Sequence, residues 1–293
     1  MRYGTGVGLV IGAALLWSLQ GLIFRQIDMA EPWAILFWRS LGMIPVIAIF
    51  ITWQDRQHGL RGLWHVGFAG VIGALGLIFA FGGAIYAIQS TTIANAVFLF
   101  SASPFITALL GWAVLGEKVR GRTWAAIGVA AIGIGVMVQG GLDRGALPGN
   151  IAALSSAAGF AIFTVTLRRS GASAMPIVLL GGIFSLIAGA GGAWFSLTPL
   201  SVPLADLGWS IGMGAGTLAF GMVLYSLGSR VVPAAELTLI SLLEVMLAPL
   251  LVWVVIGETA SQATMLGGIF VLGAVLLNAT GRARKQTALA ESA

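Results

Sequence analysis

Long uncharged segments dominate the sequence, and the longest runs from residue 62 to residue 116 without any Asp, Glu, Lys or Arg. As one helix this segment would be about 80 Å long, well beyond the roughly 30 Å hydrocarbon core of a bilayer. It must therefore fold back on itself, and the polar stretch 89–92 is the predicted turn. Comparable uncharged runs predict a polytopic helical membrane protein, and they occupy residues 3–24, 123–142, 145–167, 170–205, 207–229 and 259–281.

Ten membrane-spanning helices are predicted from these apolar runs and from the polar or glycine-containing stretches between them. Each is close to the length of about 20 residues that a spanning helix needs. Because the connections are short, the 293 residues leave no room for a separate soluble domain. The fold class is therefore an all-α membrane protein. Its helices are expected at residues 4–25, 32–52, 64–87, 92–115, 122–140, 148–168, 174–196, 205–228, 234–256 and 262–280.

Positive charge is distributed unevenly between the predicted connections. With the N-terminus in the cytoplasm, twelve of the fifteen Lys and Arg fall in cytoplasmic segments, Arg25 and Arg144 fall outside, and Arg39 lies within a helix. This bias predicts a multi-pass protein of the bacterial inner (plasma) membrane with both termini cytoplasmic. The net charge of +5 is thereby assigned to topology, and no nucleic-acid partner is expected. The absence of Cys excludes disulfides and thiolate chemistry.

Two passages of the sequence resemble each other. A Tyr-x-x-x-Ser motif begins at Tyr86 and again at Tyr225, and a Trp-x-x-x-Gly-Glu motif ends at Glu117 and again at Glu258. The offsets are 139 and 141 residues, so one copy carries a two-residue insertion. Because five is an odd number, two five-helix halves enter the membrane in opposite senses, as in many transporters. The predicted organisation is a first five-helix repeat at 1–141, a second, inverted repeat at 142–281 and a cytoplasmic tail at 282–293.

These halves resemble the drug/metabolite transporter superfamily, in particular its EamA-like ten-helix exporters and, among them, the aromatic amino acid exporter type. Trp17 is similar to that family's first-helix Trp, Arg39 to its second-helix Arg and Pro104 to its fourth-helix Pro. Glu244 resembles the acid of the ninth-helix Leu-Glu-Pro motif, although Val245 replaces the proline. The resemblance implies a bundle of two inverted halves that exports small metabolites.

Glu244 is expected about 15 Å from the cytoplasmic end of the ninth helix, near the bilayer midplane. An ionised and unpaired acid at this depth is costly, so it should face the interior of the bundle with a partner. Ser241 lies three residues earlier on the same helix face. Two interpretations remain open, namely a site for protons or a substrate ammonium, and a structural acid bonded to a neighbouring helix.

Arg39 is expected about 10 Å inside the second helix. Its guanidinium could bind a substrate carboxylate through two parallel hydrogen bonds. It could also tie the helix to Asp28, Glu31 or backbone carbonyls, or extend outward to the interface. We favour such a structural role, for example in an ion pair, over the substrate site.

Aromatic and neutral polar side chains lie inside several other predicted helices and would suit a neutral or zwitterionic substrate with an apolar body. Most such residues also pack between helices, so each has a structural alternative. Glycine stripes at 4, 8 and 12 and at 208, 212 and 216 are expected to permit close helix approach. The candidate substrate-binding or pathway residues are Trp17, Gln20, Tyr86, Asn95, Phe98, Phe163, Tyr225, Ser241 and Glu244.

The sequence as a whole predicts a secondary transporter that exports small amphipathic metabolites by alternating access through a central cavity. Amino acids, including aromatic ones, are the expected substrates, because the interior offers single charges instead of a basic cluster. A facilitator or importer of another neutral solute is the alternative, and an intramembrane enzyme or a non-transporting scaffold is remote. No cofactor, metal or catalytic residue is expected. The expected partners are the small-molecule substrate and the lipid bilayer, and the pattern is compatible with a monomer.

Overall fold

The protein is described by a computed structural model that covers residues 2–55, 59–142, 146–170, 174–232 and 234–291. Every regular element in these residues is a helix, and the described part of the chain contains no strand. Among the described residues, eight helical segments are long and apolar enough to cross a membrane. Two shorter apolar helices are found at Leu242–Ile256 and Gln262–Asn278. The predicted all-α membrane class is thereby confirmed.

The first part of the chain follows the predicted pattern of spans, with two breaks. The span expected at 4–25 is interrupted at Leu19. The span expected at 92–115 consists of two helices, because Pro104 lacks a backbone N–H and begins a new helix after the turn at Ser101 and Ala102. The helices are α1 (Tyr3–Ser18), α2 (Gln20–Phe24), α3 (Pro32–Gln54), the 3-10 helix η1 (Gly59–His65), α4 (Gly67–Ser90), α5 (Ile93–Phe100), α6 (Ser103–Leu115) and α7 (Gly121–Leu142).

The second part contains a stretch of π-helix inside one continuous span, Leu204–Gly228. Such stretches are rare and occur often at functional sites. The helices are α8 (Leu147–Ser170), α9 (Ala174–Phe195), α10 (Leu204–Gly212), the π-helix η2 (Met213–Ala219), α11 (Phe220–Gly228), α12 (Ala234–Ile256) and α13 (Gln262–Glu291). Helix α13 therefore continues through most of the segment that was expected to be a tail.

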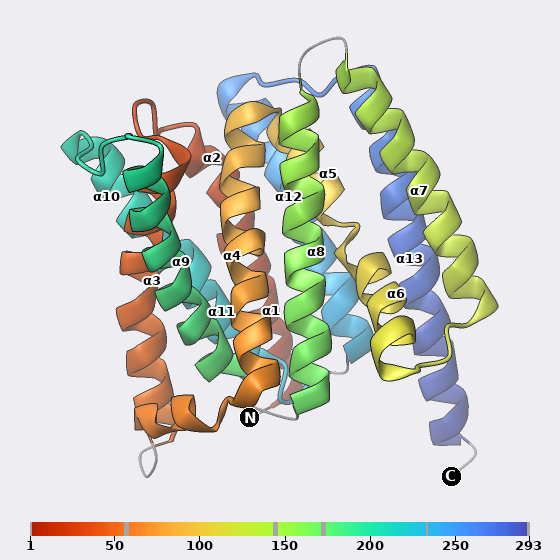
Figure 1. Ribbon diagram of the computed structural model, residues 1–293. Coiled ribbons are helices and arrows are strands. Elements are labelled where there is room, and N and C mark those ends of the chain that lie inside the picture. Colours follow the sequence, from red (N-terminus) through yellow and green to blue (C-terminus); the bar gives the residue numbers. More distant parts are fainter. Residues whose placement is uncertain (1, 56–58, 143–145, 171–173, 233, 292–293) are drawn as a thin grey trace.

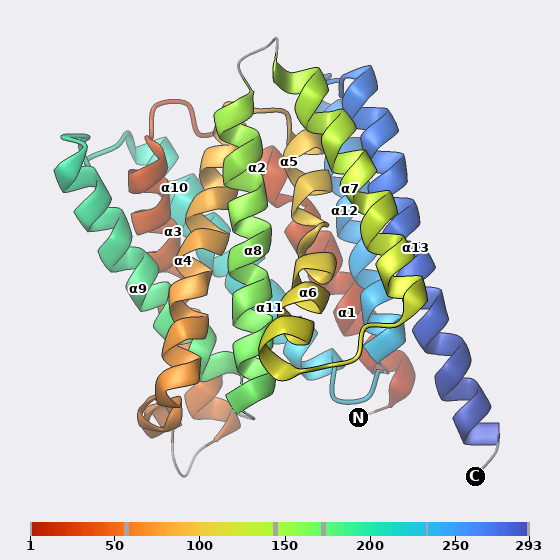
Figure 2. The same ribbon diagram turned by 45° about the vertical axis from the view of Figure 1, so that its right-hand side comes forward.

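The helices stand side by side as a bundle, and the connections between them lie at its two ends (Figures 1 and 2). We call these ends the upper and lower faces, as they are seen in Figure 1. The upper face in Figure 1 carries the connections α2–α3, α4–α5 and α12–α13, and the lower face carries the start of α1 and the connections α6–α7 and α11–α12. Helices α4 and α8 pack together in the middle of the bundle, while α7 and α13 pack together at one edge.

Close helix contacts in the bundle depend on glycines other than the predicted stripes. A Cβ built on Gly159 of α8 would lie 2.4 Å from the carbonyl oxygen of Gly76 on α4, and one built on Gly267 of α13 would lie 2.4 Å from that of Gly133 on α7. Within the stripes, Gly12 has only an ordinary contact, with Leu224 at 3.4 Å. The expectation for the stripes was wrong, because no atom lies within 4 Å of a Cβ built on Gly4, Gly8, Gly208, Gly212 or Gly216.

Candidate functional site

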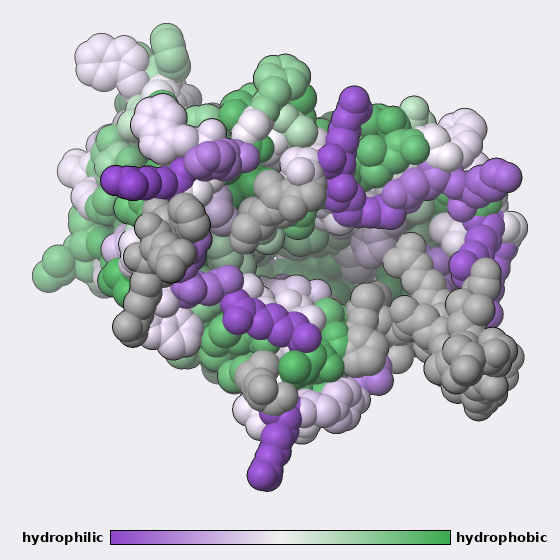
Figure 3. Space-filling model, turned by 90° about the horizontal axis from the view of Figure 1, so that it is seen from below, coloured by the Kyte–Doolittle hydropathy of each residue, from purple (hydrophilic) through white to green (hydrophobic). Residues whose placement is uncertain are grey.

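A hollow opens on the lower face of the bundle. Figure 3 views this face directly and shows that it is hollowed near its centre, with hydrophilic side chains around the hollow. The upper face differs, because several polar contacts join its connections to one another. The two faces therefore differ: the lower face is hollowed, and the connections of the upper face are joined by polar contacts.

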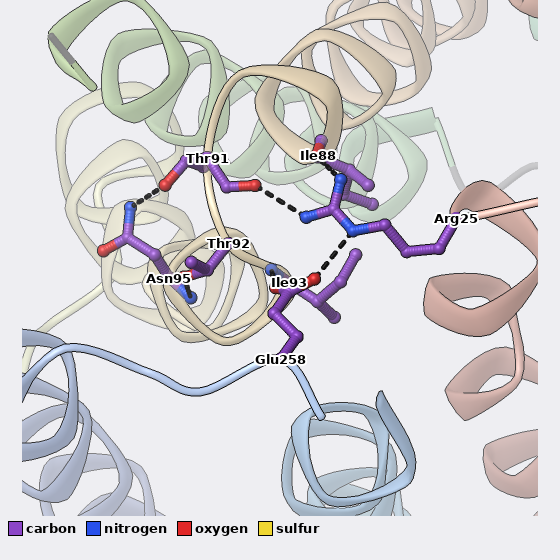
Figure 4. Close-up of polar contacts among 7 residues, drawn as sticks. All are labelled: Arg25, Ile88, Thr91, Thr92, Ile93, Asn95 and Glu258. Atoms are coloured by element: carbon purple, nitrogen blue, oxygen red, sulfur yellow. Dashed lines mark hydrogen bonds and ion pairs between the residues drawn. The ribbon is translucent and has the colours of Figure 1, made fainter. Parts of the chain in front are cut away.

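The contacts at the upper face centre on one ion pair, Arg25 with Glu258 (Figure 4). Arg25 Nε lies 2.7 Å from Glu258 Oε2, and the other guanidinium nitrogens donate to the carbonyl oxygens of Ile88 at 3.1 Å and Thr91 at 3.0 Å. The second carboxylate oxygen of Glu258 accepts the backbone N–H of Ile93 at 2.7 Å. One ion pair thus holds the end of α2, the α4–α5 turn and the α12–α13 connection together.

Further contacts tie the α2–α3 connection across the same face. The Asp206 carboxylate at the start of α10 is buried and accepts the backbone N–H groups of Met29 and Ala30, both at 2.9 Å. The Gln89 side chain at the end of α4 donates to the carbonyl oxygen of Ala30 at 2.9 Å. Together with the Arg25–Glu258 pair, these hydrogen bonds tie the connections of the upper face to one another.

Two polar contacts that are described at the lower face join side chains at its surface. Glu117 and Arg168 form an ion pair at 2.5 Å, and their side chains are 41% and 44% exposed. The Tyr3 hydroxyl donates to the Glu236 carboxylate. Among the described residues, neither contact is joined to further groups in the way that Arg25 and Glu258 are.

Arg39 is the most unusual polar residue of the interior. It is 3% exposed within α3, and its guanidinium carbon lies 5.2 Å from the centre of the Phe81 ring on α4. Its Nε and Nη2 atoms are buried without a hydrogen-bond partner. Neither Asp28 nor Glu31 forms an ion pair with it in the described part of the chain, so one of the structural alternatives is not found.

The segment opposite Arg39 is the π-helix η2. A Cβ built on Gly214 would lie 1.9 Å from the Arg39 carbonyl oxygen, so the two backbones touch. Two buried hydroxyls on the helices packed against α3, Ser185 on α9 and Ser210 on α10, also lack a partner. Buried polar groups are nearly always hydrogen-bonded, so these three side chains together need an explanation.

Comparison with known proteins gives the chain its family. The model of the EamA-like transporter family matches the chain twice, at residues 4–139 and 147–280. The chain belongs to the EamA-like transporter family. It is therefore a membrane transporter of the drug/metabolite transporter superfamily, as the resemblance of its motifs predicted.

Individual proteins that are similar to this EamA-like transporter are also described as transporters. An uncharacterized transporter of Archaeoglobus fulgidus is 26% identical over 285 residues, covering 94% of this chain and 96% of that protein. The uncharacterized transporter YwfM of Bacillus subtilis is 29% identical over 211 residues, 68% and 69% of the two chains. One from Vibrio cholerae is 26% identical over 205 residues, 67% of this chain and 65% of that protein. A solved crystal structure at 20% identity shares the fold, with a TM-score of 0.62 over 94% of this chain and 97% of that one.

Some predicted pathway residues of the transporter come together between α1 and α11. The Trp17 and Tyr225 rings lie 5.5 Å apart at 40°, and a Cβ built on Gly221 would lie 2.4 Å from Trp17 Nε1. The Trp17 Nε1 atom is buried without a partner. Gln20 is half-buried one turn further along the chain. The predicted contribution of the first and eighth spans to one site is thus geometrically possible.

Other predicted residues lie apart from this pair. Asn95 is buried at the upper end and bonded to the side chains of Thr91, Asn150 and Thr264 at 3.0, 2.5 and 3.4 Å, which is a structural network. Phe98 lines a separate groove of about 490 Å³ between α5, α12 and α13. Phe163 is buried in the main core, and Tyr86 is 43% exposed. These four residues do not gather around one pocket.

The ninth-span residues are placed only in part. Glu244 lies within α12 and is half-buried, with no hydrogen-bond partner among the described residues. Ser241 falls outside the side chains that the structure describes. The described residues contain no group of three or more His, Asp or Glu side chains that could hold a metal ion.

Proposed function

We propose that this EamA-like transporter consists of ten membrane-spanning helices in two inverted five-helix halves, residues 1–141 and 142–281, which alternate access to a central site. The twofold match of the family model supports this division. The two Gly-Glu motifs also support it. Gly116 and Gly257 end α6 and α12 in the same left-handed conformation, with φ of 68° and 77°, and they do so at opposite faces.

The lower face is proposed to be cytoplasmic, in the plasma membrane of a bacterial cell. Lys118 and Arg120 lie in the α6–α7 connection at this face, and Arg122 lies in the first turn of α7, which fits the positive-inside rule. In this orientation the hollow faces the cytoplasm and the closed end faces outward. A transporter that exports metabolites loads its substrate in such a state.

The substrate is proposed to carry a carboxylate, and Arg39 is the observation that carries this proposal. A cationic group deep in a membrane protein is costly unless an anion or a set of acceptors compensates it. Arg39 has two buried nitrogens without partners, and a guanidinium offers a carboxylate two parallel hydrogen bonds. The Phe81 ring beside it adds an apolar surface.

Amino acids meet these requirements better than other small metabolites do. Their carboxylate matches Arg39, and hydroxyls such as Ser185 and Ser210 can bond to their polar groups. The Trp17 and Tyr225 rings suit an apolar or aromatic side chain. Glu244 is proposed as a pocket residue for the ammonium group or as a structural acid, in preference to a proton carrier.

Binding to the purified protein tests the proposal without requiring transport. We expect phenylalanine to raise the melting temperature, because a ligand that binds only the folded state stabilises it. Phenylalanine amide keeps the ring and the ammonium group but lacks the carboxylate, so it should give no shift. Arg39→Gln should lose the response to phenylalanine, while the exposed Arg61→Gln keeps it. Equal stabilisation by the acid and the amide, or an unchanged response in Arg39→Gln, would contradict the assignment.

A further inference from the structure

Each of the two Gly-Glu motifs supplies the glutamate of one ion pair. In both pairs the arginine comes from the other half of the chain. Glu258 of the second half pairs with Arg25, which follows the first spanning helix of the first half. Glu117 of the first half pairs with Arg168, near the end of α8, the first spanning helix of the second half. The glutamates are offset by 258 − 117 = 141 residues and the arginines by 168 − 25 = 143. The pairs are therefore counterparts at opposite faces.

The two pairs differ in what else they hold. Arg25 and Glu258 together make three further hydrogen bonds to the α4–α5 turn, at Ile88, Thr91 and Ile93. Their side chains are accordingly only 26% and 18% exposed. Among the described residues, the Glu117 and Arg168 side chains bond only to each other. The upper pair is docked on a turn, and the lower pair is not.

The repeat identifies the turn that the lower pair would meet. Counted with the offset of the Tyr-x-x-x-Ser motif, Ile88 corresponds to Leu227 and Thr91 to Arg230. Past the two-residue insertion, Ile93 corresponds to Ala234, the first residue of α12. The counterpart of the α4–α5 turn is thus the α11–α12 turn, which lies at the same lower face as Glu117 and Arg168.

We propose that the α11–α12 turn is a second docking site, which receives the Glu117–Arg168 pair when the lower face closes. Arg168 then donates to the carbonyl oxygens of Leu227 and Arg230, and Glu117 accepts the backbone N–H at the start of α12. The Arg25–Glu258 pair leaves the α4–α5 turn in the same step. Both ion pairs persist throughout, and only their docking alternates. This inference rests on the proposed alternation between two halves.

Physical reasons indicate that the docking of the ion pairs on the turns, and not the ion pairs themselves, differs between the two conformations. An exposed ion pair contributes little by itself, because water screens it. Charge-assisted hydrogen bonds to backbone groups are stronger, and a carboxylate at the start of a helix is favoured by the helix dipole. The Arg230 side chain is exposed and can stay in water while its carbonyl oxygen accepts a bond. The docked pair therefore stabilises whichever face is closed.

Cross-linking in this Cys-free chain tests the proposal. Two matched cysteine pairs report the two docked states: T91C with T259C at the upper face, and R230C with K118C at the lower face. A short bifunctional thiol reagent should cross-link each pair, and a molecule already linked at one face should not link at the other. Simultaneous links at both faces of one molecule, or a lower pair that never links, would overturn the proposal.

Substitutions of the arginines should shift the two cross-linking yields in opposite directions. Arg168→Gln should lower the lower-face yield relative to the upper one, and Arg25→Gln should do the reverse, each by about tenfold. Arg61→Gln is the matched control and should shift neither. A shift in the same direction for both arginines, or no shift for either, would contradict alternate docking.

Exchange of the paired residues separates docking from pairing. The double variant Glu117→Arg with Arg168→Glu keeps an ion pair but places the wrong charge against the turn. If docking is required, the lower-face cross-linking yield of this double variant should be as low as in Arg168→Gln. Recovery of the wild-type yield would show that the ion pair alone is sufficient to close the lower face. Because no substrate is needed, these results stand even if amino acids fail to bind. Absence of amino acid binding with intact alternation would contradict only the proposed substrate.

Discussion

At the scale of single residues, two buried polar side chains show how a structural residue can be distinguished from a candidate for ligand binding. Asn95 and Arg39 are both 3% exposed; Asn95 was a candidate pathway residue, and Arg39 a candidate for binding a carboxylate or for a structural ion pair. Asn95 bonds to three neighbouring side chains, whereas two nitrogens of Arg39 have no partner. A buried group that the protein itself satisfies belongs to the framework, and one that it leaves unsatisfied is the better candidate for a ligand.

Asn95→Ala should therefore act on stability and leave recognition unchanged. Removing the amide leaves buried groups on Asn150 and Thr264 without this partner, and we expect the free energy of unfolding to fall by about 1–3 kcal/mol. The melting temperature should decrease, while the shift caused by phenylalanine stays. Thr164→Ala is the control, because its hydroxyl bonds only within its own helix, to the Phe160 carbonyl oxygen at 2.8 Å. Loss of phenylalanine binding at an unchanged melting temperature would instead indicate that Asn95 is a substrate-binding residue.

Glu244 is tested by a substitution that keeps its shape. Glu244→Gln retains most of its hydrogen-bonding capacity but cannot carry a proton. Since the first spanning helix has Gln20 and no acid, we expect transport in the wild type to respond weakly to an imposed pH gradient. The Gln variant should then still exchange substrate across the membrane. Steep dependence on the pH gradient in the wild type, lost in the variant, would instead identify Glu244 as a proton carrier.

At the scale of elements, the spacing of apolar residues predicted most helices to within a few residues. The second span was expected at 32–52 and is found at Pro32–Gln54. The break ahead of Pro104 and the π-helix Met213–Ala219 were not predicted. The break accompanies the missing N–H of Pro104, which the spacing of apolar residues does not record. The π-helix touches the backbone of α3 at Gly214, and periodicity along one helix contains no information about such a contact.

The glycine contacts show the same limit and give a prediction. In Gly159→Ala the new methyl group would lie 2.4 Å from the Gly76 carbonyl oxygen, so α4 and α8 must separate. We expect a loss of about 1–3 kcal/mol in the free energy of unfolding, as is typical of overpacking. Gly135→Ala in α7 is the control. It has nothing within 4 Å and should be neutral or slightly stabilising. Equal melting temperatures for both variants would show that the α4–α8 contact is looser than described.

At the scale of the whole molecule, the sequence contained the parts of the closed face but not their assembly. Glu258 stood out through its repeat with Glu117, and Arg25 stood out as a basic residue at the outer end of a helix. Their pairing joins residues 233 positions apart, and no local pattern predicts it. The pathway was harder to predict, because aromatic and amide side chains such as Phe163 and Asn95 fill the core as readily as they bind solutes.

Counterflow in proteoliposomes tests the central claim most directly, namely that this EamA-like transporter moves amino acids past Arg39. Vesicles preloaded with unlabelled phenylalanine should accumulate labelled phenylalanine transiently, because a shared alternating site couples the two fluxes. Phenylalanine amide inside the vesicles should not support this accumulation, and Arg39→Gln should reduce it by at least tenfold while Arg61→Gln does not. No accumulation above protein-free vesicles, or equal counterflow with the amide and in Arg39→Gln, would contradict the account.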